Sequence, residues 1–444
     1  MEAVISMEWW MVLTFFLGGL IILLLAGFPV AFSFLLMDLL GILVFMGVPG
    51  LKNITLGIFS SLGIFTITPV PLFILMGELM YHSHVADIAL DIMDRWLGRV
   101  PGRLGVLAAV SGTIFAATSG STMANTAMLG TVLLPEMRKR GYSASMSVGP
   151  IIGVGGLAML IPPSALAVIL ASIGGISVGG LLMAGVIPGV LLGAFFAAYI
   201  ILTAWFKPSC APNYPVPFTP FGEKLVLTVK RLLPIGIIIF SVIGVIVMGL
   251  ATPTEAAASG TIATFIVTIL YRCFNWQVLK ASIKGSIEIW VMVFMIIAGS
   301  STFSMVLAYT GASKGLLGLI ENLSLHPMMI LIIMQLIVGF MGCFMDGVSI
   351  MMICLPVFMP ISNALGFDPI WFGVLFLINI EMGQLTPPFG MLLFVMKGVA
   401  PKDITMEQII WASVPYMLFD VLIMAMIMVW PGIALWLPSI TKIL

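Results

Sequence analysis

Long apolar runs alternate along the chain with short polar junctions, and several of these runs exceed 18 residues. A helix needs about 20 apolar residues to cross the hydrocarbon core of a bilayer, so the pattern predicts spanning helices. We expect ten of them, at approximately 9–26, 30–48, 54–81, 143–176, 178–206, 225–250, 253–273, 287–310, 368–399 and 409–437. Composition agrees, because 61% of the residues are hydrophobic and only 8% are charged. The expected fold class is an all-α polytopic protein embedded in the lipid bilayer.

The stretch 103–138 departs from this pattern, because its two apolar limbs are too short to span. The limbs, 104–118 and 124–136, hold 15 and 13 residues, and each reaches only about 20 Å at about 1.5 Å per residue. The hydrocarbon core is about 30 Å thick. Basic residues precede the first limb and follow the second, so both ends are anchored on one side. The stretch predicts a re-entrant hairpin, whose tip at 119–126 turns back near the midplane.

A broken helix is expected directly after this hairpin. The stretch 143–176 is long enough to span, but Gly155-Gly156 and Pro162-Pro163 interrupt it. In transporters, a hairpin tip that faces a broken helix exposes backbone groups to ions and substrate. The two stretches together therefore predict a transport site.

The same arrangement recurs in the second half of the chain, 225 positions later. The matching residues are Pro135 with Pro360, Gly141 with Gly366, Pro162 with Pro387, and Pro163 with Pro388. On this offset Ser121 lies opposite Asp346. The second copy predicts a hairpin at 327–364 and a broken helix at 368–399. The chain then divides into three parts: a first repeat at 1–206, a Pro-rich linker at 207–223, and a second repeat at 224–444.

The positions of Lys and Arg predict the orientation in the membrane. When the first hairpin opens to the cytoplasm, 15 of the 18 basic residues fall on the cytoplasmic side, as the positive-inside rule requires. Only Lys52, Lys314 and Lys442 fall outside. The linker is then cytoplasmic, both termini are periplasmic, and the second hairpin opens outward. Because the halves have opposite orientations, the layout predicts an inverted repeat.

Composition and motifs argue against several other classes. The formal net charge is zero, which gives no reason to expect a nucleic-acid partner. The four cysteines have neither metal-site nor CxxC spacing, and the sequence has no Walker loop for ATP hydrolysis. We therefore expect no cofactor apart from coupling ions.

Five sequence motifs resemble those of one transporter family. They are SGSTMANTAMLG, LIPPS, TPTEAAA at 252–258, MDGVSIMMICLPVFMP and GQLTPPFG. In this order, and over essentially the whole chain, they resemble the large membrane subunit of tripartite ATP-independent periplasmic (TRAP) transporters.

This resemblance implies sodium-coupled symport of an organic acid, such as a C4-dicarboxylate or sialic acid, across the bacterial inner membrane. It implies two protein partners, which are a periplasmic substrate-binding protein and a small four-helix membrane subunit. It also implies an elevator-type transporter, in which a scaffold holds still while the hairpins and broken helices move together. The amphipathic stretches 84–100 and 312–325 would be the arms that join the two parts.

Sodium prefers hard oxygen ligands, which polar side chains and the backbone carbonyls of unwound helices supply. The candidate ion-binding residues are the small and polar residues of the two tips and the two breaks: Ser119, Gly120, Ser121, Asn125, Gly155, Gly156, Asp346, Gly347, Ser349, Thr386 and Pro387. The candidate substrate-binding residues are Ser121, Thr122 and Thr386. A carboxylate substrate would meet half-helix N-termini, hydroxyl groups and bound sodium.

These candidates have structural alternatives. A membrane Ser hydroxyl is often satisfied by the preceding helical turn. Asp346, deep in the bilayer, needs a cation, a water-filled cavity or a proton, or it stabilises the start of the next helix through the helix dipole. Glu381, one turn before the second break, is a weaker candidate. Interhelical hydrogen bonds or a subunit contact are the expected functions of the other acids in or near apolar segments: Asp38, Glu78, Glu255 and Asp420.

Three other functions are compatible with parts of this pattern. A stand-alone sodium/anion symporter would have the same architecture and would need no binding protein. An intramembrane enzyme would need a general base near the midplane or a second aspartate facing Asp346, and the histidines His82, His84 and His326 fall at segment ends. The duplicated broken segments argue against a channel or scaffold. We therefore expect a transporter and no enzymatic activity, and the sequence leaves open which organic acid is carried.

Overall fold

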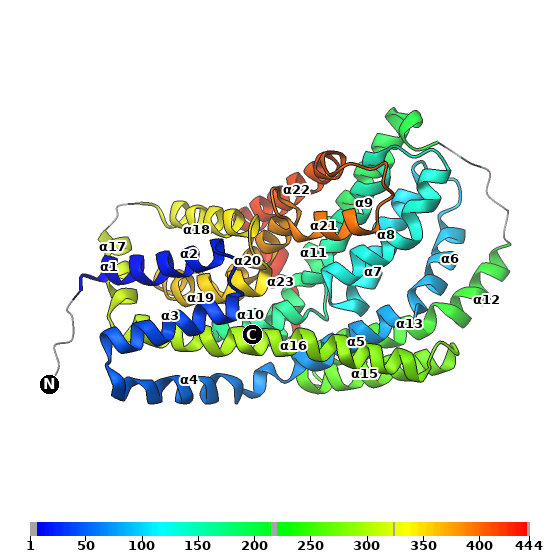
Figure 1. Cartoon of the computed structure of the whole chain (residues 1–444). Helices are drawn as coiled ribbons and strands as arrows, with labels where there is room; N and C mark the ends of the chain where they lie inside the picture. Colours follow the sequence, from blue (N-terminus) through cyan, green and yellow to red (C-terminus); the bar gives the residue numbers. More distant parts are fainter. Residues whose placement is uncertain (1–6, 213, 215–219, 323–324, 442–444) are drawn as a thin grey trace.

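The computed structural model describes residues 7–212, 214, 220–322 and 325–441, and every regular element among them is a helix (Figure 1). Five of these helices are long and apolar enough to cross a membrane, or up to seven spans if each of two bent helix pairs counts as one. The all-α polytopic class is confirmed, while the count of ten spans stays a prediction. The predicted periplasmic termini and part of the predicted 207–223 linker lie outside the described residues.

One group of helices, the platform, runs along the length of the molecule (Figure 1). Its members are α1 (Trp9–Leu13), α2 (Gly19–Leu25), α3 (Val30–Phe45), α4 (Lys52–Leu62), α5 (Pro69–His82), α13 (Leu233–Ile239), α14 (Val245–Val247), α15 (Pro253–Leu270) and α16 (Trp276–Tyr309). The 34-residue α16 packs against α3, α4 and α5. Phe303 of α16 contacts Phe16 and Phe34, with 5.3 Å between ring centroids in both pairs. Edge-to-face aromatic packing therefore stabilises the platform core.

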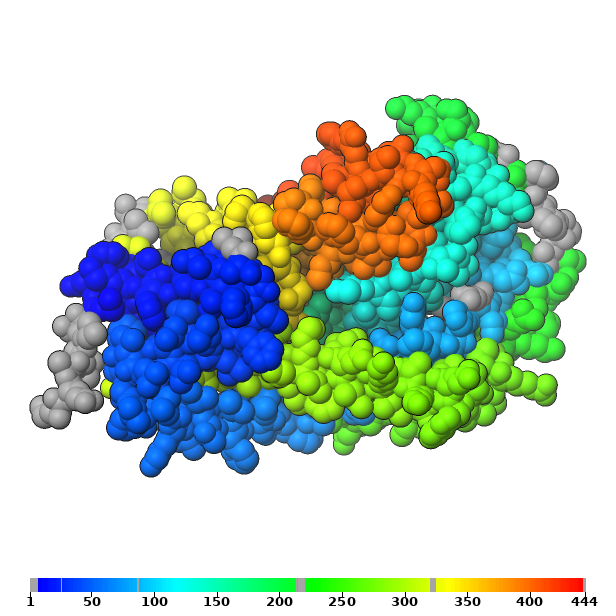
Figure 2. Space-filling model, in the orientation of Figure 1, coloured from blue at the N-terminus to red at the C-terminus, as the bar shows by residue number. Residues whose placement is uncertain are grey.

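The second group, the hairpin bundle, contains both hairpins and both broken helices. Its members are α7 (Arg103–Ser119), α8 (Thr122–Lys139), α9 (Ala144–Gly156), α10 (Ala165–Gly174), α11 (Val178–Phe206), α18 (Pro327–Gly342), α19 (Gly347–Ala364), α20 (Pro369–Leu385), α21 (Met391–Val399), α22 (Met406–Val429) and α23 (Gly432–Thr441). Figure 2 shows this bundle lying against the platform. The Tyr416 ring of α22 lies so close to α9 that a Cβ added at Gly149 or Gly153 would come within 2.7 or 2.1 Å of it. Small residues thus let these helices approach closely.

Two amphipathic helices lie at opposite ends of the molecule (Figure 1). α6 (Val85–Leu97) packs against α7 and α12 (Phe221–Arg231), while α17 (Ala312–Asn322) packs against α1, α16 and α19. They fall in the two stretches where the sequence predicts arms. Each arm therefore contacts an element of a hairpin.

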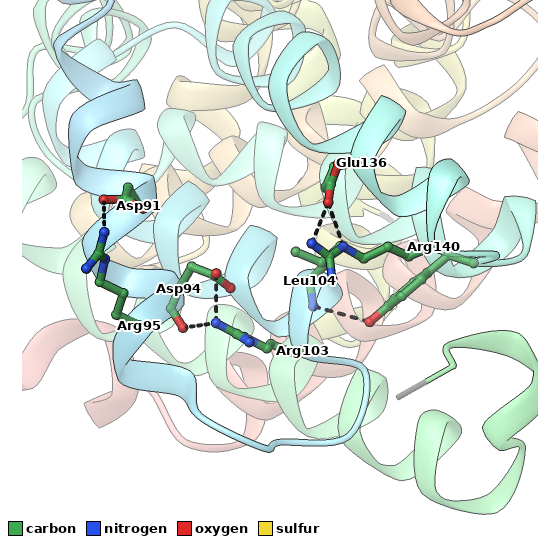
Figure 3. A network of polar contacts seen from close by, with 8 residues as sticks. Asp91, Asp94, Arg95, Arg103, Leu104, Glu136 and Arg140 are labelled. Carbon is green, nitrogen blue, oxygen red and sulfur yellow. Dashed lines mark hydrogen bonds and ion pairs between the residues drawn. The ribbon is translucent and has the colours of Figure 1, made fainter. Parts of the chain in front are cut away.

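Charged side chains fix α6 to the first hairpin (Figure 3). The buried Arg103 guanidinium lies 2.7 Å from the Asp94 carboxylate and also donates a hydrogen bond to the Asp94 carbonyl at 2.6 Å. Burial raises the pKa of the Asp94 carboxyl, while the positive charge of the nearby Arg103 partly offsets this rise. At the other limb, Arg140 pairs with Glu136 at 2.6 Å and stacks on the Tyr214 ring. This end of the hairpin is thus held by paired charges.

The two halves repeat the same helices at the predicted offset. α19 begins and ends 225 positions after α8. Short π-helical segments also recur, at Thr14–Gly18 and at Phe240–Gly244. Ser121 and Asp346 each cap the helix that follows, by accepting a hydrogen bond from the backbone N–H three residues on. The equivalent arms α6 and α17 lie at opposite ends of the molecule (Figure 1), which is compatible with the predicted inverted repeat.

Two helices predicted as continuous are bent in the structure. The predicted 54–81 helix is two helical pieces, Val48–Leu62 and Phe65–His82, at 54° to each other. The predicted 225–250 helix is likewise Phe221–Arg231 and Leu233–Val247, at 45°. In the second pair, Pro234 removes a backbone donor at the bend. In the first pair, Ile64 is extended between the two pieces and interrupts the helix.

Two other predicted boundaries are wrong. The helix predicted to start at 287 begins at Trp276, because Asn275 caps it and the lysines in its first turns lie at the exposed surface. Polar residues interrupt the hydropathy signal without interrupting a helix. The predicted 409–437 helix is two helices, α22 and α23, because the chain breaks at Trp430 and Pro431.

Candidate functional site

The tip of the first hairpin is a turn of two residues. α7 ends at Ser119, and Gly120 has a φ of 59°, a left-handed conformation that favours glycine. The Ser121 hydroxyl accepts a hydrogen bond from the Ala124 N–H, and α8 then begins at Thr122. The predicted tip at 119–126 is therefore mostly helix, and its backbone donors near Thr122 point outward as a half-helix N-terminus.

This tip faces the first break directly. A Cβ added at Gly120 would lie 2.8 Å from the Pro163 carbonyl oxygen. The break runs from 160 to 164 and contains the cis Pro162–Pro163 bond, and Ser164 caps α10. The α-helix α9 ends at Gly156, at the predicted interruption, and a 3-10 turn at Leu157–Met159 leads from there to the proline pair. Proline supplies no N–H, and backbone carbonyls at the break are therefore free to bind a ligand.

Asn125 ties this hairpin to the first broken helix. Its side chain is fully buried, and its amide nitrogen donates to the carbonyls of Gly112 on α7 (3.2 Å) and Val154 on α9 (3.1 Å). The side-chain oxygen Oδ1 is also buried and has no hydrogen-bond partner within the described ranges. Asn125 therefore holds three helices together and keeps one oxygen available as an acceptor.

Gly155 and Gly156 serve as contact points on α9. A Cβ at Gly155 would lie 1.8 Å from the Thr126 hydroxyl oxygen, and one at Gly156 would lie 2.6 Å from a carboxyl oxygen of Glu381. These glycines thus allow α8 and α20 to pack directly against the α9 backbone. Their observed contribution is close helix packing, next to the residues of the tip.

The second tip is capped by Asp346. One carboxyl oxygen accepts a hydrogen bond from the Ser349 N–H at 3.0 Å, and the other accepts from the Ser349 hydroxyl. α19 then begins at Gly347. Asp346 thus occupies the position that stabilises a helix start, which was the structural alternative for this residue.

The second break lies against this tip. The Phe389 N–H donates to the Cys343 carbonyl at 3.1 Å, which joins the break to the turn before Asp346. The Thr386 hydroxyl donates to the Met382 carbonyl at 2.8 Å, so it is satisfied by its own helix. Like its counterpart, the break contains a cis bond, Pro387–Pro388.

One hydrogen bond joins the first tip to the second broken helix, and sequence reasoning missed it. The Thr122 hydroxyl donates to the side-chain oxygen of Gln384 at 2.9 Å, and both side chains are buried. The two residues are 262 positions apart, and no spacing or motif links them. The 225-residue offset places Thr122 opposite Gly347, and Gly347 lies near Gln384 in the structure. This offset is the only sequence signal that could have indicated that these segments meet.

The other predicted acids have separate environments. Glu381, on α20, is fully buried and lies within electrostatic reach of the equally buried Asp420 on α22. Asp38 is fully buried in α3. Glu78 pairs with His82 at 3.3 Å, and Glu255 forms the capping box that starts α15 with Thr252. No group of three or more His, Cys, Asp or Glu placed to hold a metal ion occurs in the described part of the chain.

Cavities of different size adjoin the bundle among the described residues. A small one, about 10 Å³, lies between α5 and the first tip and is lined partly by Thr118, Ser119 and Asn125. A larger one, about 560 Å³, is lined by residues at the start of α5, the start of α11 and the α14–α15 junction, and by none of the candidate residues. This larger cavity is thus separate from the tips.

Two solved structures share the fold of this chain. The chain matches the YdaH transporter of Alcanivorax borkumensis with a TM-score of 0.63 at 13% identity, over 88% of this chain and 90% of that one. It matches MtrF of Neisseria gonorrhoeae with a TM-score of 0.60 at 12% identity, over 88% and 84%. The fold is thus that of polytopic membrane transporters.

The sequence comparisons then give the family. The model of the DctM component of tripartite ATP-independent periplasmic transporters matches residues 17–433. The C4-dicarboxylate TRAP transporter large permease protein DctM of Rhodobacter capsulatus is 31% identical, over 95% of this chain and 98% of that protein. The ectoine large permease TeaC of Halomonas elongata is 30% identical (96% and 98%), and the sialic acid large permease SiaM of Vibrio cholerae is 27% identical (94% and 96%). This chain belongs to the DctM family of TRAP transporter large permeases, which are multi-pass inner-membrane transport subunits and not enzymes.

Proposed function

We propose that this chain is the membrane-spanning pathway of a sodium-coupled transporter that imports an organic acid delivered by a periplasmic binding protein. Family membership supports transport, and relatives named for C4-dicarboxylate, sialic acid and ectoine support a small polar substrate, with a carboxylate as its common group. The observation that carries the proposal is the pair of capped hairpin tips, each packed on a proline-broken helix.

The tips provide the chemistry for sodium. At the first tip, the buried Asn125 oxygen and the Ser121 hydroxyl lie beside a break with free carbonyls. At the second tip, Asp346 supplies the negative charge. We assign ion binding to the candidate residues of both tips and breaks, and substrate contact to Ser121, Thr122 and Thr386. The half-helix N-termini of α8, α10, α19 and α21 would attract a carboxylate.

An elevator movement of the hairpin bundle against the platform fits this arrangement. The hairpins and broken helices pack on one another more than on the platform. Ser300 of α16 bonds the Met352 carbonyl of α19 at 2.8 Å, and Ser172 of α10 bonds the Thr66 carbonyl at 3.1 Å, so single hydroxyl-to-backbone bonds cross this interface. α6 and α17 would be the arms. The proposal includes repeats at 1–206 and 224–444, a cytoplasmic linker at 207–223 and periplasmic termini.

Two partners complete the proposed transporter. No soluble domain occurs in the described ranges, so capture of dilute substrate falls to a periplasmic binding protein. A small four-helix membrane subunit would enlarge the platform, along a flank such as 9–26 or 225–250. The test uses vesicles that contain the chain, with or without the small subunit. Labelled organic acid is supplied either free or bound to its receptor, and its uptake is measured. We expect uptake only with both partners. Full uptake of free substrate by the chain alone would establish the stand-alone symporter instead.

A further inference from the structure

We propose that Gln384 is a positioning residue that couples the two hairpin tips, so that sodium binding at one tip favours sodium binding at the other. This inference rests on the proposed function. Gln384 belongs to the GQLTPPFG motif but is not among the candidate site residues; it is the penultimate residue of α20 and is 3% exposed.

The first half of the link is a direct hydrogen bond. The Thr122 hydroxyl donates to the Gln384 side-chain oxygen at 2.9 Å. Thr122 is the first residue of α8, directly after the Ser121 cap, and it is 5% exposed. A bond between two buried side chains cannot be replaced by water, so separating them leaves both groups unpaired at a cost in free energy.

The second half of the link is the proximity of Gln384 to the other tip. The Gln384 side-chain nitrogen lies 3.8 Å from the position that a Cβ on Gly347 would take. Gly347 is the first residue of α19, directly after the Asp346 cap, and it is the repeat equivalent of Thr122. One side chain therefore bonds to this position in the first repeat and lies near it in the second.

The backbone of Gln384 lies directly beside the second break. A Cβ added at Gly390, which precedes α21, would lie 2.7 Å from the Gln384 carbonyl oxygen. A shift of the break thus moves the side chain that holds both tips. The residue at the equivalent place in the first repeat is Met159, which is buried and has no amide. The link made by Gln384 therefore has no equivalent at Met159, and its amide belongs to the second repeat.

This geometry predicts cooperative sodium dependence. If sodium orders one tip, the Thr122–Gln384 bond and the packing of Gln384 near Gly347 favour the bound arrangement of the other. Without the bond, the tips would bind sodium independently. A coupling of this kind changes affinity by about fivefold or more.

The experiment uses the assembled transporter in vesicles and measures initial uptake against sodium concentration. Gln384→Met installs the side chain found at the equivalent position, and Thr122→Val removes the donor with little change of shape. We expect each to make the sodium dependence less steep and to raise the half-saturating sodium concentration about fivefold. The double variant should change the sodium dependence no more than either single variant does. Thr122→Ser should have the same dependence of uptake on sodium as the wild type. Thr131→Val is the matched control, because the Thr131 hydroxyl bonds its own helix at Ala127.

A second readout needs only the purified chain. Amide hydrogen exchange at 347–350 in α19 should rise when Thr122→Val is made in α8, while Thr131→Val should leave it unchanged. Wild-type sodium steepness in both single variants, additive losses in the double variant, or unchanged exchange at 347–350 would overturn the coupling. Sodium-independent uptake by the wild type would instead overturn the proposed function, and the coupling with it.

Discussion

Ser121 and Asp346 occupy the same place in the two repeats and cap the following helix in the same way. One side chain is neutral and the other is a carboxylic acid, so the two tips are chemically unequal despite their equivalent backbones. Helix capping accounts for the presence of either residue type. Only the charge of Asp346 requires a further reason, because an ionised carboxylate within a membrane is costly unless a cation or water accompanies it.

Asp346→Asn separates capping from charge. Asparagine caps a helix about as well as aspartate, so the variant should assemble normally. We expect sodium-driven uptake to fall about tenfold, which corresponds to about 1.4 kcal/mol of lost ion binding. Uptake by the purified and reconstituted transporter, measured across sodium concentrations, checks this. An unchanged sodium dependence would mean that Asp346 is a helix cap and nothing more.

Asn125→Ala tests the first tip. It removes two hydrogen bonds, to the carbonyls of Gly112 and Val154, and should lower the free energy of unfolding by about 1–3 kcal/mol. It should also abolish sodium-driven uptake, because it removes a buried oxygen beside the first break. Thermal unfolding and uptake are the two measurements. Asn363→Ala, at an exposed position of α19, serves as the control. Wild-type uptake by Asn125→Ala would remove this residue from the ion site.

At this scale the sequence identified the polar residues of each tip but not their partners. Asn125 stands out because it is an amide within an apolar run, whereas its carbonyl partners are invisible in a sequence. The Thr122–Gln384 bond joins residues 262 positions apart in opposite repeats. Hydropathy and spacing describe a side chain's own helix, and such a contact depends on how two hairpins pack.

Among the helices, the 225-residue offset was the strongest predictor. It placed α8, α10, α19 and α21 within a few residues, because proline and glycine interrupt helices wherever they stand. Hydropathy alone performed worse at the ends of helices. It merged α4 with α5, since an apolar bend has the same composition as an apolar helix, and it started α16 too late because of Lys280 and Lys284.

A contact between α5 and the first tip gives a prediction for the interface between platform and bundle. A Cβ at Gly77 would lie 1.9 Å from the Ser119 carbonyl oxygen, which is backbone and cannot rotate away. Gly77→Ala should therefore push the tip off α5, at a cost of about 1–3 kcal/mol in unfolding free energy, and should slow uptake. The control is Gly236→Ala, where nothing lies within 4 Å and stability should change by no more than about 1 kcal/mol, in the favourable direction. Equal behaviour of the two variants would contradict the contact.

For the whole molecule, the charge distribution predicts which side each arm faces. Lys314 of α17 and Lys402 after α21 are both exposed, and the proposed orientation puts them on opposite sides. In a chain without its four native cysteines, an impermeant thiol reagent applied to intact cells should label Lys314→Cys. Lys402→Cys should be labelled only after the membrane is permeabilised. The reverse pattern would invert the proposed topology.

The central claim is that substrate movement through this chain is coupled to sodium through the paired tips. The most direct measurement follows labelled sodium and labelled organic acid together, in the same vesicles, with both partner proteins present. We predict that sodium enters with substrate in a fixed ratio and that an unloaded receptor elicits neither flux. Substrate that accumulates inside the vesicles while no sodium enters would contradict the account.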